Sequence, residues 1–483
     1  MGNEMDTRKA TINGTIWSMI ERFSTMGIQL LCTLIIAQYL PPSQFGLVSM
    51  MSIFLSFSMV MAEAGFGQAI IREKDVQQLD TSSIFYFNII IAIIIYCLSF
   101  LCAPFIASFY RQPELTALMR VAFLAIIIQS FAIVQGSLLQ KSVNFSVVSK
   151  ASLIAVFLSG IIGIVIAIIY KNAWALVFQS LSFSTFQTAF FWLFCNWRPS
   201  LLYSWKAVKK YLGFSLSLLG SRLIASIADN LANMFIGRAY TSTELGYYTV
   251  PDKLQRSIAG SVSFSIHRVS YPVMSTFQDD VEKLRVYSQG IVGVAFYIIS
   301  PIMIYLLVVS PQFFSVILSP EWAESAIYFR YMCVIGAVFC FADINMDILL
   351  VKGRSKMVLY LEIVRKTVLV ACLLIGILYS IKTLLVILVL YNVFNAILIS
   401  YFSGKEIKCS LFQQLLNILP TALCLLMSGF VTYFISGYFS NAYFCLVITF
   451  FVFFFLYLLS SHLLRIKHFY VLFNVVKGLK LKK

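Results

Sequence analysis

Apolar segments long enough to cross a lipid bilayer follow one another along nearly the whole chain, separated only by short polar breaks between Thr15 and Leu464. A bilayer core requires about 20 apolar residues per helix, and the backbone inside it must satisfy its own hydrogen bonds. Segments of this length satisfy their backbone hydrogen bonds by forming helices. Because 60% of the residues are hydrophobic and only 12% are charged, the chain is predicted to be an all-α integral membrane protein.

The sequence predicts about 14 transmembrane helices. Their expected ranges are 14–39, 47–71, 84–109, 117–139, 149–169, 173–195, 212–237, 247–274, 287–309, 325–351, 357–379, 382–402, 416–438 and 441–463. The start of the chain lacks the short apolar core and small-residue cleavage pattern of a signal peptide, so the first span is expected to remain in the mature protein.

The distribution of basic residues predicts how the helices are oriented. If the amino terminus is cytoplasmic, the termini and alternate loops on that side carry 23 Lys and Arg residues, and the opposite loops carry 5. Positive residues concentrate on the cytoplasmic side of membrane proteins. We therefore expect both termini in the cytoplasm. The net charge of +16 follows this pattern, and no nucleic-acid partner is expected.

Segments of the two halves resemble each other. The sequence IAQYLPPSQFG at Ile36 to Gly46 recurs as IGRAYTSTELG at Ile236 to Gly246, and DVQQL at Asp75 is followed by DVEKL at Asp280. Four such matches in order along the chain predict two repeats of six helices. Six is even, so both repeats keep one orientation, as in transporters that rock one half against the other.

The repeat gives the predicted domain boundaries: an N-terminal lobe at 1–200, a C-terminal lobe at 201–403, two extra helices at 404–464 and a basic cytoplasmic tail at 465–483. Apolar residues are interleaved with the lysines of the tail. It is expected either to lie on the anionic cytoplasmic leaflet or to be a disordered solubilising segment.

Two arginines occupy matching positions in the first helix of each repeat. Arg22 and Arg222 lie about 15 Å into their spans at 1.5 Å per residue, where a guanidinium costs about 2.5 to 3.5 kcal/mol on insertion scales. Such residues are kept where something inside the protein uses them, and an anionic substrate is one candidate. The alternative is an internal ion pair with Glu21 or Asp229.

Further charges fall in the second repeat. Lys253 and Arg256 are three residues apart and are candidates for lining a cationic cavity, although Asp252 could neutralise Lys253. Arg268 and His267 lie near a helix end, where snorkelling to the interface explains them.

Carboxylates at membrane depth are candidates either for ion coupling or for pairing with these cations. They are Asp229, Asp343 and Asp347. The spacing of Glu362 and Lys366 favours a pair within one helix. Glu63 precedes a pair of glycines that either allow close helix packing or break the helix, and packing is the preferred interpretation.

The sequence indicates no cofactor and no metal site. The ten cysteines are scattered singly, there are three histidines, and neither a Walker motif nor Gly-x-Gly-x-x-Gly occurs in a strand-to-helix setting. The largest polar break, 196–211, is too short for a soluble catalytic domain. An enzyme is therefore not expected.

The motifs resemble the polysaccharide transporter branch of the multidrug/oligosaccharidyl-lipid/polysaccharide exporter superfamily, which includes the O-antigen and exopolysaccharide flippases of bacteria. The resemblance covers roughly residues 12 to 400. It rests on WSMIER at Trp17, YLPPSQFGLV at Tyr39, EAGFGQAII at Glu63, APFIASFYRQPELTALMRV at Ala103, NWRP at Asn196, ELGYYTVPDKLQ at Glu244, RVSYPVMSTFQDD at Arg268 and PEWAESAIYFRYM at Pro320.

This resemblance implies two six-helix lobes around a central cavity, through which a polyprenyl-diphosphate-linked oligosaccharide moves from the cytoplasmic to the periplasmic leaflet. The partners would be that glycan, membrane lipids and other polysaccharide assembly proteins. Two alternatives stay open. A cation-coupled drug exporter of the same superfamily would line its cavity with acids, and a membrane-embedded polymerase would need catalytic groups on a larger extracytoplasmic loop.

Overall fold

The computed structural model describes residues 2–142 and 145–480, and throughout this part of the chain the regular secondary structure is helical. The last three residues of the predicted tail lie outside it. The helices fall into two compact units, residues 1–249 and 250–483. The predicted all-helical class is thus confirmed, whereas the predicted domain boundaries stay a prediction.

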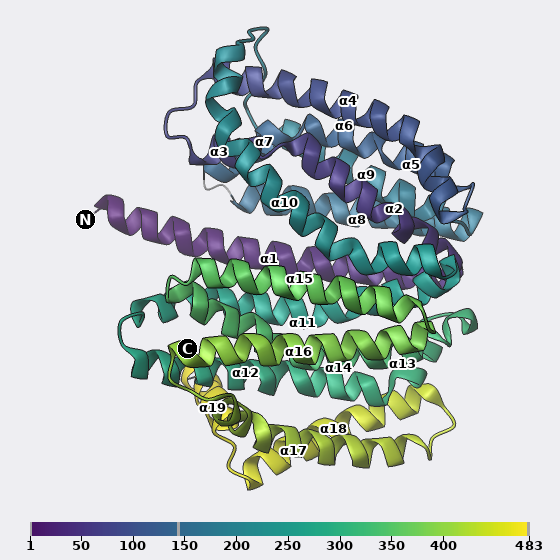
Figure 1. Ribbon diagram of the computed structural model, residues 1–483, viewed down its shortest axis with the longest axis vertical. Coiled ribbons are helices and arrows are strands. Elements are labelled where there is room, and N and C mark those ends of the chain that lie inside the picture. Colours follow the sequence, from purple (N-terminus) through teal and green to yellow (C-terminus); the bar gives the residue numbers. More distant parts are fainter. Residues whose placement is uncertain (1, 143–144, 481–483) are drawn as a thin grey trace. The chain divides into compact units, whose positions relative to one another are not determined.

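Unit 1 contains ten complete helices among its described residues. They are α1 (Gly2–Tyr39), α2 (Pro42–Glu63), α3 (Phe66–Arg72), α4 (Gln78–Tyr110), α5 (Leu115–Ala122), α6 (Leu124–Ser130), α7 (Ile133–Lys141), α8 (Phe145–Tyr170), α9 (Trp174–Phe194) and α10 (Trp205–Ala239). Within this unit α8 packs against α1 and α9, and α10 packs against α2 and α4 (Figure 1).

Helix α11 (Ser242–Thr276) begins in unit 1 and continues into unit 2. The other helices of unit 2 are α12 (Val281–Val308), α13 (Ser310–Ile317), η1 (Pro320–Trp322), α14 (Ser325–Val351), α15 (Ser355–Ile377), α16 (Ile381–Glu406), α17 (Leu411–Ser436), α18 (Ala442–Leu463) and α19 (Lys467–Lys480). Figure 1 shows α12, α14 and α16 side by side in this unit, in agreement with their contacts.

Each of the fourteen predicted spans coincides with a helix or with a short series of helices. Ten helices are long and apolar enough to cross a membrane, and the bent series from Leu115 to Lys141 makes an eleventh candidate. Three further predicted spans correspond to α9, α11 and α15, which do not meet this test of length and composition. The chain is therefore an integral membrane protein with ten or eleven candidate spans.

Residues at the two ends of α2 explain where this helix begins and stops. Pro42 occupies the first turn of α2, where a missing N–H costs nothing. At its other end Ala64 and Gly65 both adopt left-handed backbone, with φ of 47° and 75°. That conformation stops α2 and lets α3 start in a new direction. Gly65 therefore takes part in the helix break, and it also allows close packing, because a Cβ there would lie 2.8 Å from the backbone carbonyl of Ser215 on α10.

The first turns of α2 and α11 cross at a pair of glycines. A Cβ at Gly46 would overlap the backbone carbonyl of Ser242, and a Cβ at Gly246 would overlap that of Pro42. The contact is reciprocal, and its residues are 200 positions apart, as are the repeated motifs that contain them. Only glycine allows the two backbones to approach this closely.

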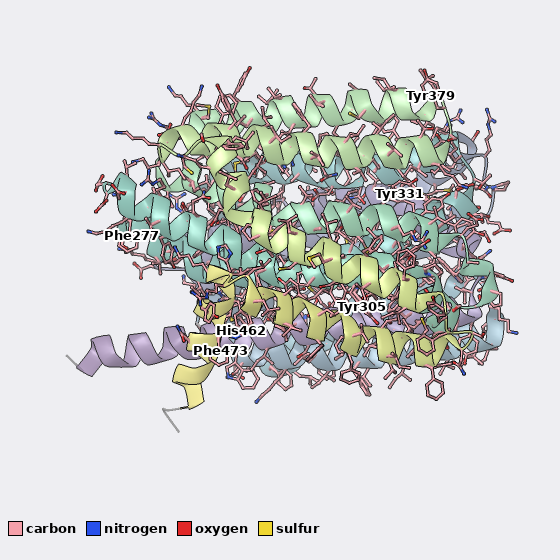
Figure 2. The ribbon with its side chains drawn as sticks, turned by 90° about the horizontal axis from the view of Figure 1, so that it is seen from below. Phe277, Tyr305, Tyr331, Tyr379, His462 and Phe473 are labelled. Carbon is pink, nitrogen blue, oxygen red and sulfur yellow. The ribbon has the colours of Figure 1, made fainter. Side chains whose placement is uncertain are left out.

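Two tyrosine hydrogen bonds attach α18 to α12. Tyr305 of α12 donates a hydrogen bond to the carbonyl of Leu446 on α18 over 2.8 Å (Figure 2). Tyr457 of α18 donates to the carbonyl of Tyr297 over 3.0 Å. These bonds satisfy polar groups within an apolar interface, so α18 has a defined position against α12.

Helix α19, which forms most of the predicted tail, also packs against α12. His468 is buried, and a Cβ at Gly293 would overlap its ring. The tail residues 467–480 are thus helical, as the interfacial interpretation requires. His462, near the end of α18, contacts α19: Tyr470 bonds to His462 Nδ1 over 3.1 Å, and the rings of His462 and Phe469 lie 6.1 Å apart between centroids.

The docking of α19 should weaken at acidic pH. Burial, and secondarily Lys467, lowers the pKa of His468 from its ordinary value of 6.5. The docked form thus binds fewer protons than the released form, so docking is strongest above about pH 6.5 and is lost as pH falls below it. Amide hydrogen exchange of residues 469–474, corrected for intrinsic rates, should be faster at pH 5.5 than at pH 7.5. His468→Gln should remove this difference, and equal protection of the wild type at both pH values would contradict the prediction.

Candidate functional site

An ion pair links the end of α2 to the middle of α10 inside unit 1. Arg222 Nη1 donates to Glu63 Oε1 over 2.6 Å, and about a third of each side chain is exposed. The left-handed turn at Ala64 and Gly65 ends α2 directly after Glu63, which places this carboxylate beside α10. The pair explains how a guanidinium and a carboxylate are tolerated at membrane depth.

This pairing differs from the one that the sequence suggested. Asp229, two turns after Arg222 on the same helix, is exposed and forms no ion pair among the described residues. Glu63 lies 159 positions away in sequence, so helical spacing could not have found it. Its location before a glycine pair in a membrane span was the one available signal.

A polar cavity of about 380 Å³ adjoins the ion pair. All of its lining residues belong to unit 1 and come from α2, α3, α6, α7, α9 and α10 and from the turn before α7. The polar members of the lining are Glu63, Gln68, Gln129, Ser130, Ser137, Gln140, Gln187 and Arg222. A concentration of amides and hydroxyls inside a membrane-spanning bundle is costly unless it is used.

Two glycines keep this cavity open. A Cβ at Gly136 would lie 3.0 Å from the ring of Phe191, and one at Gly67 would lie 3.0 Å from Ser137 Oγ and 3.4 Å from Glu63 Oε1. The two distances of 3.0 Å are tighter than ordinary van der Waals contact. The small residues thus hold space that side chains would fill.

Arg22, the counterpart of Arg222 in the repeat, is exposed on α1. The neighbouring Glu21 accepts a hydrogen bond from Ser149 on α8 over 3.3 Å. The structure therefore gives Glu21 a helix-packing contact. Arg22 and Arg222 are thus alike in sequence position and differ in surroundings.

The cations at the start of α11 are arranged differently from the expectation. Asp252 accepts from Arg256 Nε over 2.8 and 3.0 Å, one turn along the helix. Pairing of Asp252 with its neighbour Lys253 was the alternative to a role of Lys253 in lining the cavity. Lys253 is exposed and makes no ion pair in the described ranges. Adjacent residues on a helix point in different directions, which is why the partner four residues away is preferred.

The carboxylates of α14 are occupied by side chains of α11. Asp347 contacts His267 Nδ1 over 2.6 Å, and Asp343 accepts a hydrogen bond from Ser263. His267 was expected to snorkel to the interface, and instead it faces a buried carboxylate. The residues on each helix are four apart, so the two contacts lie one above the other. Both lie within unit 2.

The ion pair predicted within α15 also differs from the one observed. Glu362 binds Arg365 over 2.6 Å at a spacing of three, rather than Lys366 at a spacing of four. Both spacings place side chains on one helix face, and spacing alone does not choose between them. Among the described residues, no group of three or more acidic, His or Cys side chains could hold a metal ion.

The fold is that of a known class of membrane transporters. The structure is similar to that of lipid II flippase MurJ in an inward closed conformation, with a TM-score of 0.74, 14% sequence identity and coverage of 94% of this chain and 98% of that one. It also resembles an inward-facing multidrug resistance MATE family transporter of the MOP superfamily, with a TM-score of 0.60, 18% identity and coverage of 81% and 98%.

Sequence comparison identifies the family within this class. The profile of the polysaccharide biosynthesis protein family matches residues 35–327, and the chain belongs to this family. Lipopolysaccharide biosynthesis protein WzxC of Escherichia coli (strain K12) is 24% identical over 352 residues, 72% of each chain. Teichuronic acid biosynthesis protein TuaB of Bacillus subtilis (strain 168) is 21% identical over 356 residues, 73% of each chain. The resemblance inferred from the sequence motifs is thereby confirmed.

Proposed function

We propose that the protein is a flippase that moves a polyprenyl-diphosphate-linked oligosaccharide, an O-antigen or exopolysaccharide repeat unit, from the cytoplasmic to the periplasmic leaflet. The observation that carries this proposal is the polar cavity beside the Arg222–Glu63 pair, because a bundle of membrane helices has no structural need for such a cavity. Membership of the polysaccharide biosynthesis family and a relative named succinoglycan biosynthesis transport protein, ExoT of Rhizobium meliloti (strain 1021), support it.

The mechanism proposed is alternating access by two repeats of six helices, with fourteen spans in all and both termini cytoplasmic in the bacterial inner membrane. Support comes from the repeated motifs and from the reciprocal Gly46 and Gly246 contact. The cycle involves no covalent change in the substrate, so the protein is not an enzyme. Other polysaccharide assembly proteins would supply and receive the glycan.

The diphosphate is proposed to bind to Arg22, Arg222, Lys253 and Arg256. Entry into the bundle removes water from the diphosphate, and fixed cations then replace its hydration. Lys253 is the member that forms no ion pair in the described part of the chain, whereas Arg222 and Arg256 are held by Glu63 and Asp252. For Arg222 and Arg256, substrate phosphate would compete with a carboxylate already in place.

Asp343 and Asp347 keep their proposed role as either ion-coupling groups or charge partners. Their contacts with Ser263 and His267 support pairing. Asp229 is exposed on α10 and remains a candidate for coupling.

The choice of substrate class is testable in liposomes that contain the purified protein. We expect exchange of a fluorescent lipid-linked oligosaccharide between leaflets, and no exchange in protein-free liposomes. Ethidium accumulation driven by a proton or sodium gradient, in the absence of oligosaccharide exchange, would contradict the proposal and favour a drug exporter. Formation of new glycosidic bonds by the purified protein would instead favour a polymerase.

A further inference from the structure

The cavity of unit 1 offers hydrogen bonds that the protein itself does not use. The side-chain amides of Gln68, Gln129 and Gln140 line it and make no hydrogen bond within the described ranges. Gln187, by contrast, donates to Ser152 Oγ over 3.3 Å. Gln68 and Gln140 are exposed and Gln129 is half-buried, so the three amides that line this one space are accessible to a ligand that both donates and accepts hydrogen bonds.

The cavity carries no net charge. Glu63 and Arg222 are its ionic members, and each neutralises the other over 2.6 Å. An acidic ligand would be attracted to Arg222 only by separating it from Glu63, which would leave a carboxylate without its partner at membrane depth. A neutral ligand can occupy the cavity with this pair intact.

One wall of the cavity is aromatic. Phe191 of α9 lines it, and the ring is kept clear by Gly136, where a Cβ would lie 3.0 Å away. An aromatic ring beside amide groups suits a pyranose, whose apolar face packs against rings and whose hydroxyls both donate and accept hydrogen bonds. The volume of about 380 Å³ is at the lower end of the range of small-molecule sites, about 300 to 1,000 Å³.

We infer that this cavity is a subsite for one neutral sugar ring of the transported glycan. Gln68, Gln129 and Gln140 bind its hydroxyls, and Phe191 packs against its apolar face. The inference rests on the proposed function for the identity of the glycan as cargo. It adds that recognition of the sugar takes place inside unit 1, in the cavity that Arg222, one of the cations proposed for the diphosphate, also lines.

Binding of free sugars tests the inference without transport. Saturation-transfer NMR on the full chain in nanodiscs should show binding of at least one of D-glucose, D-galactose and N-acetyl-D-glucosamine. D-glucuronate should bind about tenfold more weakly than that sugar, a difference of about 1.4 kcal/mol. Failure of all three neutral sugars to bind, or equal or tighter binding of D-glucuronate, would overturn the inference.

Two kinds of variant locate the binding. Gly136→Ala should narrow the space beside Phe191, and Gln129→Leu should remove one amide at similar volume. Each should weaken sugar binding about tenfold. Gly213→Ala is the matched control, because a Cβ there has no neighbour within 4 Å. Unchanged binding in both cavity variants would overturn the inference. If the melting temperature of either variant shows that this variant is unfolded, Gln140→Leu takes its place.

The same preparations separate this inference from the proposed function. Lipid-linked oligosaccharide exchange with unaltered half-saturation in the cavity variants would support the flippase and overturn the subsite. Sugar binding that depends on Gln129 and Gly136, together with an absence of exchange by the wild type, would support the subsite and count against the flippase.

Discussion

Arg222→Ala should reduce the rate of lipid-linked oligosaccharide exchange by about tenfold or more and lower the stability of the folded protein by about 1 to 3 kcal/mol. The substitution leaves Glu63 without the guanidinium that now lies 2.6 Å from it, and an uncompensated carboxylate at membrane depth is costly. It also removes a proposed ligand of the diphosphate. Exchange in proteoliposomes and thermal denaturation measure the two effects separately.

A charge-swap cycle measures how much the ion pair between Arg222 and Glu63 contributes to stability, separately from any role of Arg222 in substrate binding. Arg222→Glu and Glu63→Arg should each destabilise the protein through like charges, and the double variant should recover most of the loss. Arg238→Ala is the matched control on the same helix, because Arg238 is exposed and contacts the ring of Phe109 instead of an acid. Additive effects of the two swaps would show that the pair contributes nothing to stability.

Gly46→Ala and Gly246→Ala should each destabilise the folded protein more than alanine substitutions of other glycines within helices. The added methyl group meets a backbone carbonyl, of Ser242 or Pro42, and a carbonyl held within a helix cannot rotate away. One helix start must shift, and overpacking of this kind costs about 1 to 3 kcal/mol and occasionally more. We expect low yields of folded protein and little exchange.

The control for these two variants is Gly27→Ala on α1, where a Cβ meets nothing within 4 Å. It should be neutral or slightly stabilising, because alanine is the better helix former. Comparison of melting temperatures in one detergent measures the difference. Wild-type stability of Gly46→Ala would contradict the close crossing of α2 and α11.

Hydrophobic length predicted the positions of the helices well. The apolar segments could be located because lipid imposes one length on all of them. Breaks within spans were harder to predict. The left-handed turn at Ala64 and the bent series from Leu115 to Lys141 both lie within continuous apolar sequence.

Side-chain pairing was predicted least well, for two reasons. Within a helix, spacings of three and four are nearly equivalent, so Arg365 rather than Lys366 binding Glu362 could not be decided from spacing. Between helices, no periodicity connects Arg222 with Glu63 or His267 with Asp347. The polar cavity depends on six helices that meet in space, and its glutamines appear isolated in the sequence.

The central claim is tested most directly by leaflet exchange of a lipid-linked oligosaccharide in proteoliposomes, with the wild type compared with Arg22→Ala plus Arg222→Ala. The account predicts rapid exchange by the wild type and a loss of about tenfold or more in the double variant, at equal amounts of inserted protein. Exchange at the wild-type rate in the double variant would contradict the proposed role of the two arginines, and an absence of exchange by the wild type would contradict the flippase itself.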